Sequence, residues 1–180
     1  MAAKRLIIGL GNPGIEYDNT RHNAGAMALS YTTQSLGLPE FKFDKYSNSF
    51  ITKDSENMFV FPQTFMNLSG KTVSFLMSKE IISTDNILIL HDDKDIALGE
   101  SPIQRNRSSA GHKGIQSIID SIGSQDFHRI RIGIGPLPEK IETDTFVLQK
   151  FTQEELNVFR EKVFPQVELQ IKSFIQENRA

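Results

Sequence analysis

The sequence predicts an α/β protein, a single globular domain over residues 1–180 in which helices flank a twisted mixed β-sheet. Three observations lead to this prediction. Apolar runs of strand length alternate along the chain with longer segments of helical periodicity. A length of 180 residues fits one hydrophobic core and leaves little room for a second domain. The hydrophobic fraction of 38% and the charged fraction of 23% are those of an ordinary globular protein.

Four elements are expected in the first half of the chain. The apolar run RLIIGL ends in the turn-forming GNPG, which predicts a buried strand followed by a turn. Ala, Met and Leu then recur at helical spacing until Gly37 and Pro39 end the helix. Two short apolar runs flank a polar stretch, as strands of a hairpin do. The elements are a strand at residues 5–10, a helix at 24–36, and strands at 50–52 and 58–61.

Five further elements are expected in the second half. The first is a helix, followed by the apolar run NILIL and then by the polar stretch HDDKD, which we expect to form a turn. Isoleucines later alternate with Arg129 and Arg131, which predicts a half-buried strand with both arginines on one face. Pro165 should kink or divide the C-terminal covering helix. The elements are helices at 68–80, 114–122 and 152–178, and strands at 86–90 and 129–134.

The composition excludes several classes of protein. Without cysteine, the chain has no disulfide, no thiolate metal site and no cysteine nucleophile. The apolar run at the N-terminus is too short for a signal peptide, and no stretch approaches the length of a membrane span. We therefore expect a cytoplasmic protein that does not bind membranes. The net charge of −2 argues against a wholly basic nucleic-acid binder but permits a local basic patch.

The loop GLGNPG matches the G-x-G-x-x-G pattern of dinucleotide-binding proteins. That pattern also needs an acidic residue roughly 20 positions further on, to bind the ribose. No Asp or Glu occurs over residues 19–39, and the helix begins too late to hold a phosphate at its N-terminus. A nucleotide-dependent enzyme is therefore a minor alternative, and we expect no cofactor.

His22 and the stretch HDDKD are the candidate catalytic groups. His22 lies in a polar loop after GNPG, where a helix cap or a surface histidine is the plainer interpretation. Asp92 follows a predicted strand, where α/β proteins gather their sites, and its carboxylate could orient His22. A solvated acidic turn and a metal site with His91 are the alternatives for HDDKD. Because the spacing matches no zinc motif, we expect no metal.

Two polar groups point to substrate binding. Asn67 could cap the helix that follows it, or its amide could bind a peptide carbonyl or an oxyanion. Basic side chains cluster in the loop between the acidic stretch and the last predicted strand, and two more lie on one face of that strand. The pattern is typical of phosphate contacts, although ordinary solubilising charge explains it equally well. The basic residues are Arg105, Arg107, His112, Lys113, Arg129 and Arg131.

Several motifs together resemble bacterial peptidyl-tRNA hydrolase. In order they are GLGNPG with Tyr17, TRHNAG, PQTFMNLSGK, HDDKD, AGHKG and FHRIRIGIG, followed by a weaker match at FVLQKF. The first six run from Gly9 to Gly135 and cover most of the chain. The resemblance implies hydrolysis of the ester between an N-blocked peptide and the terminal ribose of tRNA, which frees tRNA from peptides that left the ribosome.

The resemblance also implies a role for each site residue. His22 would be the general base that activates water, and Asp92 would orient it. Asn12 and Asn67 would hold the peptide, with Asn12 helping to distinguish N-blocked substrates from free aminoacyl esters. The remaining expected substrate contacts are Tyr17, Phe65, Met66, His112 and Lys113, and the expected tRNA phosphate contacts are Arg105, Arg107 and Arg131.

One position departs from the pattern of the family. Many members have asparagine after the histidine of the GHNG motif, whereas this chain has Lys113. Lysine is a point charge and lacks the paired donor and acceptor of an amide, so we expect altered substrate affinity with activity retained. The adjoining loop, residues 104–109, also differs from the glycine-rich version of some members.

The partner expected from the resemblance is peptidyl-tRNA, bound by a monomer without an obligate protein partner. The main alternative is a catalytically silent relative that keeps the fold and binds RNA. The presence of Asn12, His22, Asn67 and Asp92 argues against that alternative.

Overall fold

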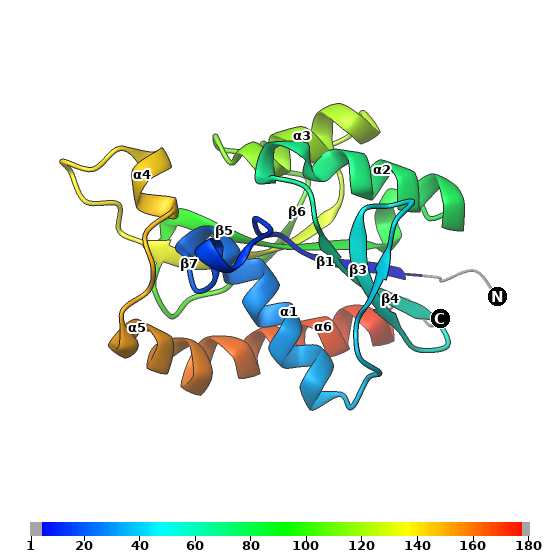
Figure 1. Cartoon of the computed structure of the whole chain (residues 1–180), viewed down its shortest axis with the longest axis horizontal. Helices are drawn as coiled ribbons and strands as arrows, with labels where there is room; N and C mark the ends of the chain where they lie inside the picture. The colour runs from blue at the N-terminus through cyan, green and yellow to red at the C-terminus, as the bar shows by residue number, and fades with distance from the viewer. Residues whose placement is uncertain (1–4, 178–180) are drawn as a thin grey trace.

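A seven-stranded mixed sheet forms the centre of the protein, with helices on both faces (Figure 1). The computed structural model describes residues 5–177. The strand order is β2-β3-β4-β1-β5-β7-β6. The strands are β1 (Arg5–Gly9), β2 (Lys42–Asp44), β3 (Ser49–Lys53), β4 (Asn57–Pro62), β5 (Ile87–Ala97), β6 (Ile103–Arg105) and β7 (His128–Gly135). This arrangement confirms the predicted α/β class and the mixed sheet.

The helices bury two separate apolar cores against the two faces of the sheet. On one face, α1 and α6 cover Ile7, Leu88 and Ile132, and on the other, α2 and α3 cover Ile8 and Ile89. The odd and even positions of β1, β4 and β5 thus enter different cores, as the alternation of side chains along a strand requires. The helices are α1 (Ala24–Ser35), α2 (Ser69–Glu80), α3 (Lys113–Ile122), α4 (Thr143–Val147), α5 (Gln153–Val158) and α6 (Phe164–Glu177).

The four central strands are parallel, and this brings their C-terminal ends to one edge of the sheet. β1 pairs in parallel with β4 and β5, and β5 pairs in parallel with β7. The remaining strands, β2, β3 and β6, run antiparallel to their neighbours. Loops that follow β1, β4 and β5 therefore meet at the same edge, where ligands bind in open α/β sheets.

The prediction that HDDKD forms a turn is wrong, because β5 continues through this stretch to Ala97. Parallel pairing with β7 joins His91 to Arg131, Asp92 to Ile132 and Asp93 to Gly133. The backbone hydrogen bonds of this ladder keep His91, Asp92 and Asp93 extended, and all three are buried. Consecutive polar residues resembled a turn in the sequence because their partner strand lies about 40 positions away in the chain.

Two short strands and a short helix were not predicted. β2 and β6 have three residues each and lie at the edges of the sheet, and α4 has five residues. The last predicted strand is buried on both faces rather than half-buried, because Arg129 packs under the loop that contains Arg107 and Ser108, and Gly133 lies against the backbone of Ala97. The C-terminal helix is divided, as Pro165 suggested, by a π-helical segment at Phe159–Val163; the predicted end at Asn178 lies outside the described residues.

Within residues 5–177, no helix combines the length and the apolar character that crossing a membrane requires.

Candidate active site

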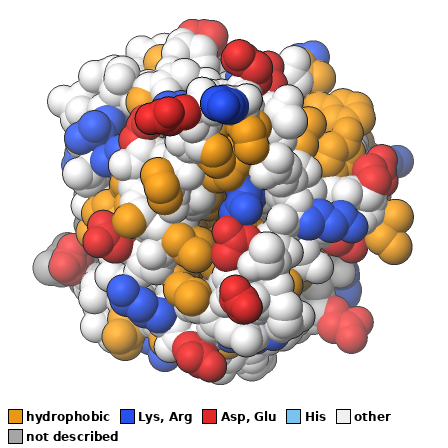
Figure 2. Space-filling view, turned by 90° about the vertical axis from the view of Figure 1, so that its left-hand side faces the viewer, with side chains coloured by type: hydrophobic (Ala, Val, Ile, Leu, Met, Phe, Trp, Pro, Cys, Tyr) orange, Lys and Arg blue, Asp and Glu red, His pale blue; other side chains and the backbone are white. Residues whose placement is uncertain are grey.

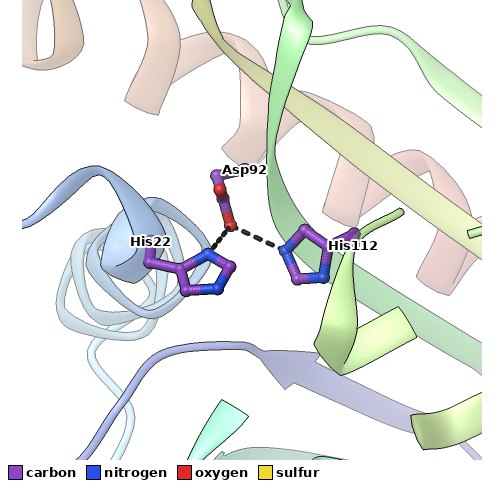
Figure 3. Close-up of side chains that lie close together, drawn as sticks. All are labelled: His22, Asp92 and His112. Carbon is purple, nitrogen blue, oxygen red and sulfur yellow. Dashed lines mark hydrogen bonds and ion pairs between the residues drawn. The ribbon is translucent and has the colours of Figure 1, made fainter. Parts of the chain in front are cut away.

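Three side chains from distant parts of the chain meet where the parallel strands have their C-terminal ends (Figure 3). His22 Nδ1 lies 2.8 Å from Asp92 Oδ1, and His112 Nε2 lies 2.7 Å from the same oxygen. His22 belongs to a 3₁₀ turn, η2 (Arg21–Asn23), and Asp92 belongs to β5. His112 is the residue immediately before α3. One carboxylate oxygen therefore binds two histidines.

Close packing of α1 on β5 brings His22 to Asp92. Gly25, in the first turn of α1, lies so near β5 that a Cβ atom there would be 2.1 Å from the carbonyl oxygen of Leu90. Any larger residue would push the start of the helix away from the strand. Since η2 leads directly into α1, the same contact brings the His22 turn close to Asp92.

The hydrogen bonds of His112 define its tautomer. Its Nδ1 accepts from the backbone N–H groups of Gly114 and Ile115, at 3.1 and 3.2 Å, and so caps the N-terminus of α3. An accepting Nδ1 carries no proton, so the proton of the neutral ring lies on Nε2 and is donated to Asp92. His112 thereby couples the start of α3 to the carboxylate.

His22 is arranged as a base. Its Nδ1–H donates to Asp92, which leaves the lone pair on Nε2 for a ligand in the adjoining pocket. Burial acts to lower the pKa of His22, but the charge and hydrogen bond of Asp92 outweigh it and raise the pKa above its usual value. Burial likewise acts to raise the pKa of Asp92, yet the two histidines hold it well below its usual value. Asp92 is therefore ionised.

His91 lies next to this group but shares no hydrogen bond with the side chains of His22, Asp92 or His112. Its Nδ1 bonds to the carbonyl of Asp92 at 2.8 Å, and its ring lies edge-on to His112 with the centroids 4.9 Å apart. Burial lowers its pKa well below the usual value, so the ring is neutral. The earlier alternative of a metal held by His91 and two aspartates gains no support from this orientation.

His22, Asp92 and His112 are the one group in residues 5–177 whose potential metal-ligand atoms lie within 4.8 Å of one another. These atoms are already hydrogen-bonded to each other, and the second ring nitrogen of His112 is bound to α3. A metal ion would have to replace both histidine–carboxylate bonds. The arrangement fits an oriented base better than a metal centre.

A pocket opens beside the two histidines, between β5, the loop before α3, and α4. Figure 2 views the end of the molecule that carries α4 and shows acidic, basic and apolar side chains intermixed there. The pocket is lined by His22, Asp92, Asp93, Lys94, Asp95, Ser109, Ala110, Gly111, His112, Lys113, Thr143, Asp144 and Val147.

Asn12 and Asn67 lie on the loops that follow β1 and β4. Asn12 Oδ1 accepts the backbone N–H of Met66 at 2.8 Å, which leaves its NH₂ group free to donate to a ligand. Its backbone is held by Asn23, which accepts from the N–H and donates to the carbonyl. Asn67 is exposed and caps neither η3 (Met66–Leu68) nor α2, so the capping alternative is wrong.

Apolar side chains surround these amides. Tyr17 and Phe65 make an edge-to-face contact with ring centroids 6.3 Å apart, and Phe65 is 55% exposed. Met66 is buried, and its sulfur lies over Gly114 at the start of α3. The predicted substrate-contact residues of the β1 and β4 loops are therefore neighbours.

Lys113 is exposed but paired. Its Nζ lies 2.7 Å from Asp144 Oδ2, so an exposed ion pair joins the start of α3 to α4 across the pocket wall. Asp144 had no signal in the sequence, because α4 is a five-residue helix without a clear apolar period.

The predicted basic cluster is not gathered in one place. Arg105 is paired with Asp85 and Asp126 at the far end of β7, and Arg131 is paired with Asp93. Arg107 is exposed. Arg129, expected on the same strand face as Arg131, is 1% exposed and donates to the carbonyls of Arg107, Ser108 and Gln125.

Two residues next to His22 were missed by the sequence analysis, although both lie in the TRHNAG motif. Asn23 holds the backbone of Asn12, and Arg21 is buried against the segment that contains α4 and α5. An asparagine and an arginine in a polar loop carry no pattern that separates a buried role from an exposed one. Their contacts depend on segments 11 and more than 120 residues away.

Comparisons with known proteins agree on one family. The family model described as "Peptidyl-tRNA hydrolase" matches residues 6–180. The peptidyl-tRNA hydrolase of Methylacidiphilum infernorum is 39% identical over 168 residues, which are 93% of this chain and 90% of that protein. That of Fervidobacterium nodosum is 45% identical over 154 residues, 85% of this chain and 79% of that protein. The crystal structure of peptidyl-tRNA hydrolase from Acinetobacter baumannii superposes with a TM-score of 0.89 at 30% identity, covering 98% of this chain and 91% of that one.

Proposed function

This chain belongs to the peptidyl-tRNA hydrolase family and hydrolyses peptidyl-tRNA, and we propose that His22, oriented by Asp92, is the general base of the reaction. The observation that carries the proposal is the 2.8 Å bond from His22 Nδ1 to a buried carboxylate, which leaves Nε2 unbonded on a side chain that lines the pocket. A histidine held in this tautomer can accept a proton from a water molecule.

The proposed reaction is a direct attack of water on the ester. Nε2 takes one proton from the water as its oxygen bonds to the carbonyl carbon. The ester C–O bond then breaks, and His22 returns the proton to the departing ribose oxygen. The products are a peptide with a free carboxyl group and tRNA with a free terminal hydroxyl. Asp92 stabilises the imidazolium that exists between the two proton transfers.

Asn12 and Asn67 are the proposed amides for the peptide part. The NH₂ group of Asn12 has a fixed direction, because its carbonyl oxygen is bound to Met66. It is therefore ready to donate to a peptide carbonyl, which an N-blocked substrate has and a free aminoacyl ester lacks at its N-terminus. The Asn67 amide is exposed and could donate to the oxygen that becomes negative during attack. Tyr17, Phe65 and Met66 would pack against the substrate nearby.

The three arginines proposed to contact tRNA phosphates differ in how free their charges are. Arg107 is exposed and adjoins the pocket loop, so it is the readiest candidate. Arg131 and Arg105 would each have to share their charge with carboxylates that they already bind. A cytoplasmic monomer acting on peptides released from the ribosome also remains our expectation, with no metal or cofactor required by the proposed steps.

A catalytically silent RNA-binding protein is not favoured. The proposed base and its carboxylate are present and correctly bonded, which such a protein would have no need to keep. The test is hydrolysis of an N-acetylated aminoacyl-tRNA by the wild type, with no metal or nucleotide added and EDTA present. Rapid release of free tRNA supports the proposal. Intact substrate that is bound but not cleaved would support the silent relative.

A further inference from the structure

We propose that Arg21 is a positioning residue that fastens the His22 turn (Arg21–Asn23) to the segment containing α4, so that the base keeps its alignment with Asp92 and with the pocket wall. Arg21 touches neither the pocket nor the proposed reacting atoms. The inference rests on the function proposed above for His22 and concerns how that side chain is held.

The guanidinium of Arg21 is enclosed by residues from the C-terminal part of the chain. Its NH1 lies 2.9 Å from Glu155 Oε1. Its central carbon lies 4.6 Å from the ring centroid of Phe146 and 5.1 Å from that of Phe151, within the range of cation–π attraction. Arg21 is 8% exposed, so these contacts form out of water, where they are stronger.

The backbone strengthens the same connection. The N–H of Arg21 donates to the carbonyl of Gln149, and the N–H of Phe151 donates to the carbonyl of Asn19. Thr20 and Lys150 form an antiparallel bridge between these two bonds. Residues 19–21, which lead into the His22 turn, therefore pair with residues 149–151 through antiparallel backbone hydrogen bonds.

The segment held by Arg21 also forms part of the pocket. Thr143, Asp144 and Val147 of α4 line the pocket, and Phe146 lies between them, buried against Arg21. One side of His22 is thus fixed to α4 through Arg21. The other side is fixed to the GNPG turn through Asn23, which binds Asn12.

The His22 turn needs such anchors because it has few of its own. It is a three-residue 3₁₀ turn whose N-cap, Thr20, makes no side-chain capping bond to it. A small rotation of the turn would lengthen the bond from His22 to Asp92. Misplacement of a catalytic group by about 1 Å can lower a rate about a hundredfold.

The test substitutes Arg21→Met, which keeps the apolar stem and removes the guanidinium. Arg5→Met is the matched control, because Arg5 is 1% exposed and paired with Glu56 at the start of β1, away from the site. At a temperature where all variants are folded, we expect Arg21→Met to lower kcat about ten- to a hundredfold with little change in KM. Arg5→Met should keep the wild-type kcat even if its melting temperature falls.

A pH profile separates positioning from general destabilisation. The titratable and charged groups that face His22 are Asp92, His112, Lys113 and Asp144. If Arg21 maintains the bond between His22 and Asp92, Arg21→Met weakens that bond and moves the acid limb of the activity profile to lower pH. Loss of stability by itself would leave the limb in place.

A second variant tests the proposed route. Phe146→Leu removes the ring beneath Arg21, and the double variant should lose no more activity than Arg21→Met, because residues acting through one contact are non-additive. Should Arg21→Met fail to fold, Glu155→Gln is the alternative variant. It removes the ion pair with Arg21, and the glutamine amide oxygen can still accept the capping bond of α5. We expect the acid limb to move to lower pH in this variant as well, by a smaller amount.

The two proposals fail in different ways. Wild-type kcat and an unmoved acid limb in Arg21→Met would overturn the positioning role and leave His22 as the base. Full activity of His22→Ala would overturn the base itself, and with it the reason for positioning it.

Discussion

At the scale of single residues, Asp92 is the shared hydrogen-bond partner of two histidines. One oxygen accepts from His22 and from His112, and the second ring nitrogen of each has a different environment. That of His112 is bound to the start of α3, whereas that of His22 is unbonded, on a side chain that lines the pocket. Two histidines with the same partner are therefore not interchangeable: His22 can accept a proton from water, and His112 holds the carboxylate in place.

Asp92→Asn should change the pH dependence of the enzyme. His22 must be neutral to accept a proton, so activity falls in acid as the ring is protonated. In the wild type Asp92 raises the pKa of His22, so the acid limb of kcat/KM should lie at higher pH than it would for the same histidine without Asp92. Asn cannot supply the charge, so the limb should move to lower pH while the maximal rate falls. An acid limb at the same pH in both proteins would contradict the pairing.

Lys113→Asn tests the departure from the family pattern. Lys113 pairs with Asp144 at the surface, with 58% and 72% of the two side chains exposed, so the ion pair adds little to stability. We expect the substitution to change KM for peptidyl-tRNA and to leave kcat and the melting temperature near their wild-type values. An inactive wild type that Lys113→Asn restores would show that lysine blocks the site.

At the scale of elements, α3 begins at a residue that also belongs to the site. His112 satisfies two N–H groups at the helix N-terminus, a task more often performed by Ser, Thr, Asp or Asn. The first turn of α3 and the carboxylate of Asp92 are joined through this ring. A change at His112 should therefore alter the stability of α3 and the geometry of the site together.

Two substitutions separate these effects. His112→Ala removes the cap and the bond to Asp92, so it should lower the free energy of unfolding by about 0.5–2 kcal/mol and also lower kcat. His112→Asn restores a capping oxygen, but its shorter side chain does not reach Asp92. We expect it to recover most of the stability and little of the activity, as measured by thermal unfolding and by hydrolysis. Equal recovery of both would assign His112 to the helix alone.

The elements also explain what the sequence could and could not predict. Helices such as α3 and strands such as β7 were recognisable because their periodicity is local. The extension of β5 through Asp92 was not, because extended polar residues are held by a partner strand that is distant in the chain. His22 and Asp92 could be named from motifs and strand ends, whereas the contacts of Arg21 depend on rings that only the fold brings near.

At the scale of the whole molecule, the parallel strands place every proposed catalytic and peptide-binding residue at one edge of the sheet. The protein has a net charge of −2, and the face around the pocket mixes both signs (Figure 2). A tRNA molecule would therefore be attracted by a few local cations, not by a uniformly basic surface.

The salt dependence of the reaction should reflect that small number of cations. KM for peptidyl-tRNA should rise with salt as phosphate contacts are screened, with kcat nearly constant. Arg107→Ala should reduce the slope of log KM against log salt by about one if Arg107 contacts one phosphate. The measurement is steady-state hydrolysis over a salt series. An unchanged slope would remove Arg107 from the interface.

The most direct test of the central claim compares hydrolysis of N-acetyl-aminoacyl-tRNA by the wild type, His22→Ala and His128→Ala, with tRNA binding measured in parallel. His128 lies on β7 at the other end of the sheet and packs on Phe174, so it controls for loss of a histidine. We predict that His22→Ala loses about 10²–10⁴-fold in kcat and still binds tRNA, while His128→Ala stays active. Wild-type turnover by His22→Ala would contradict the account.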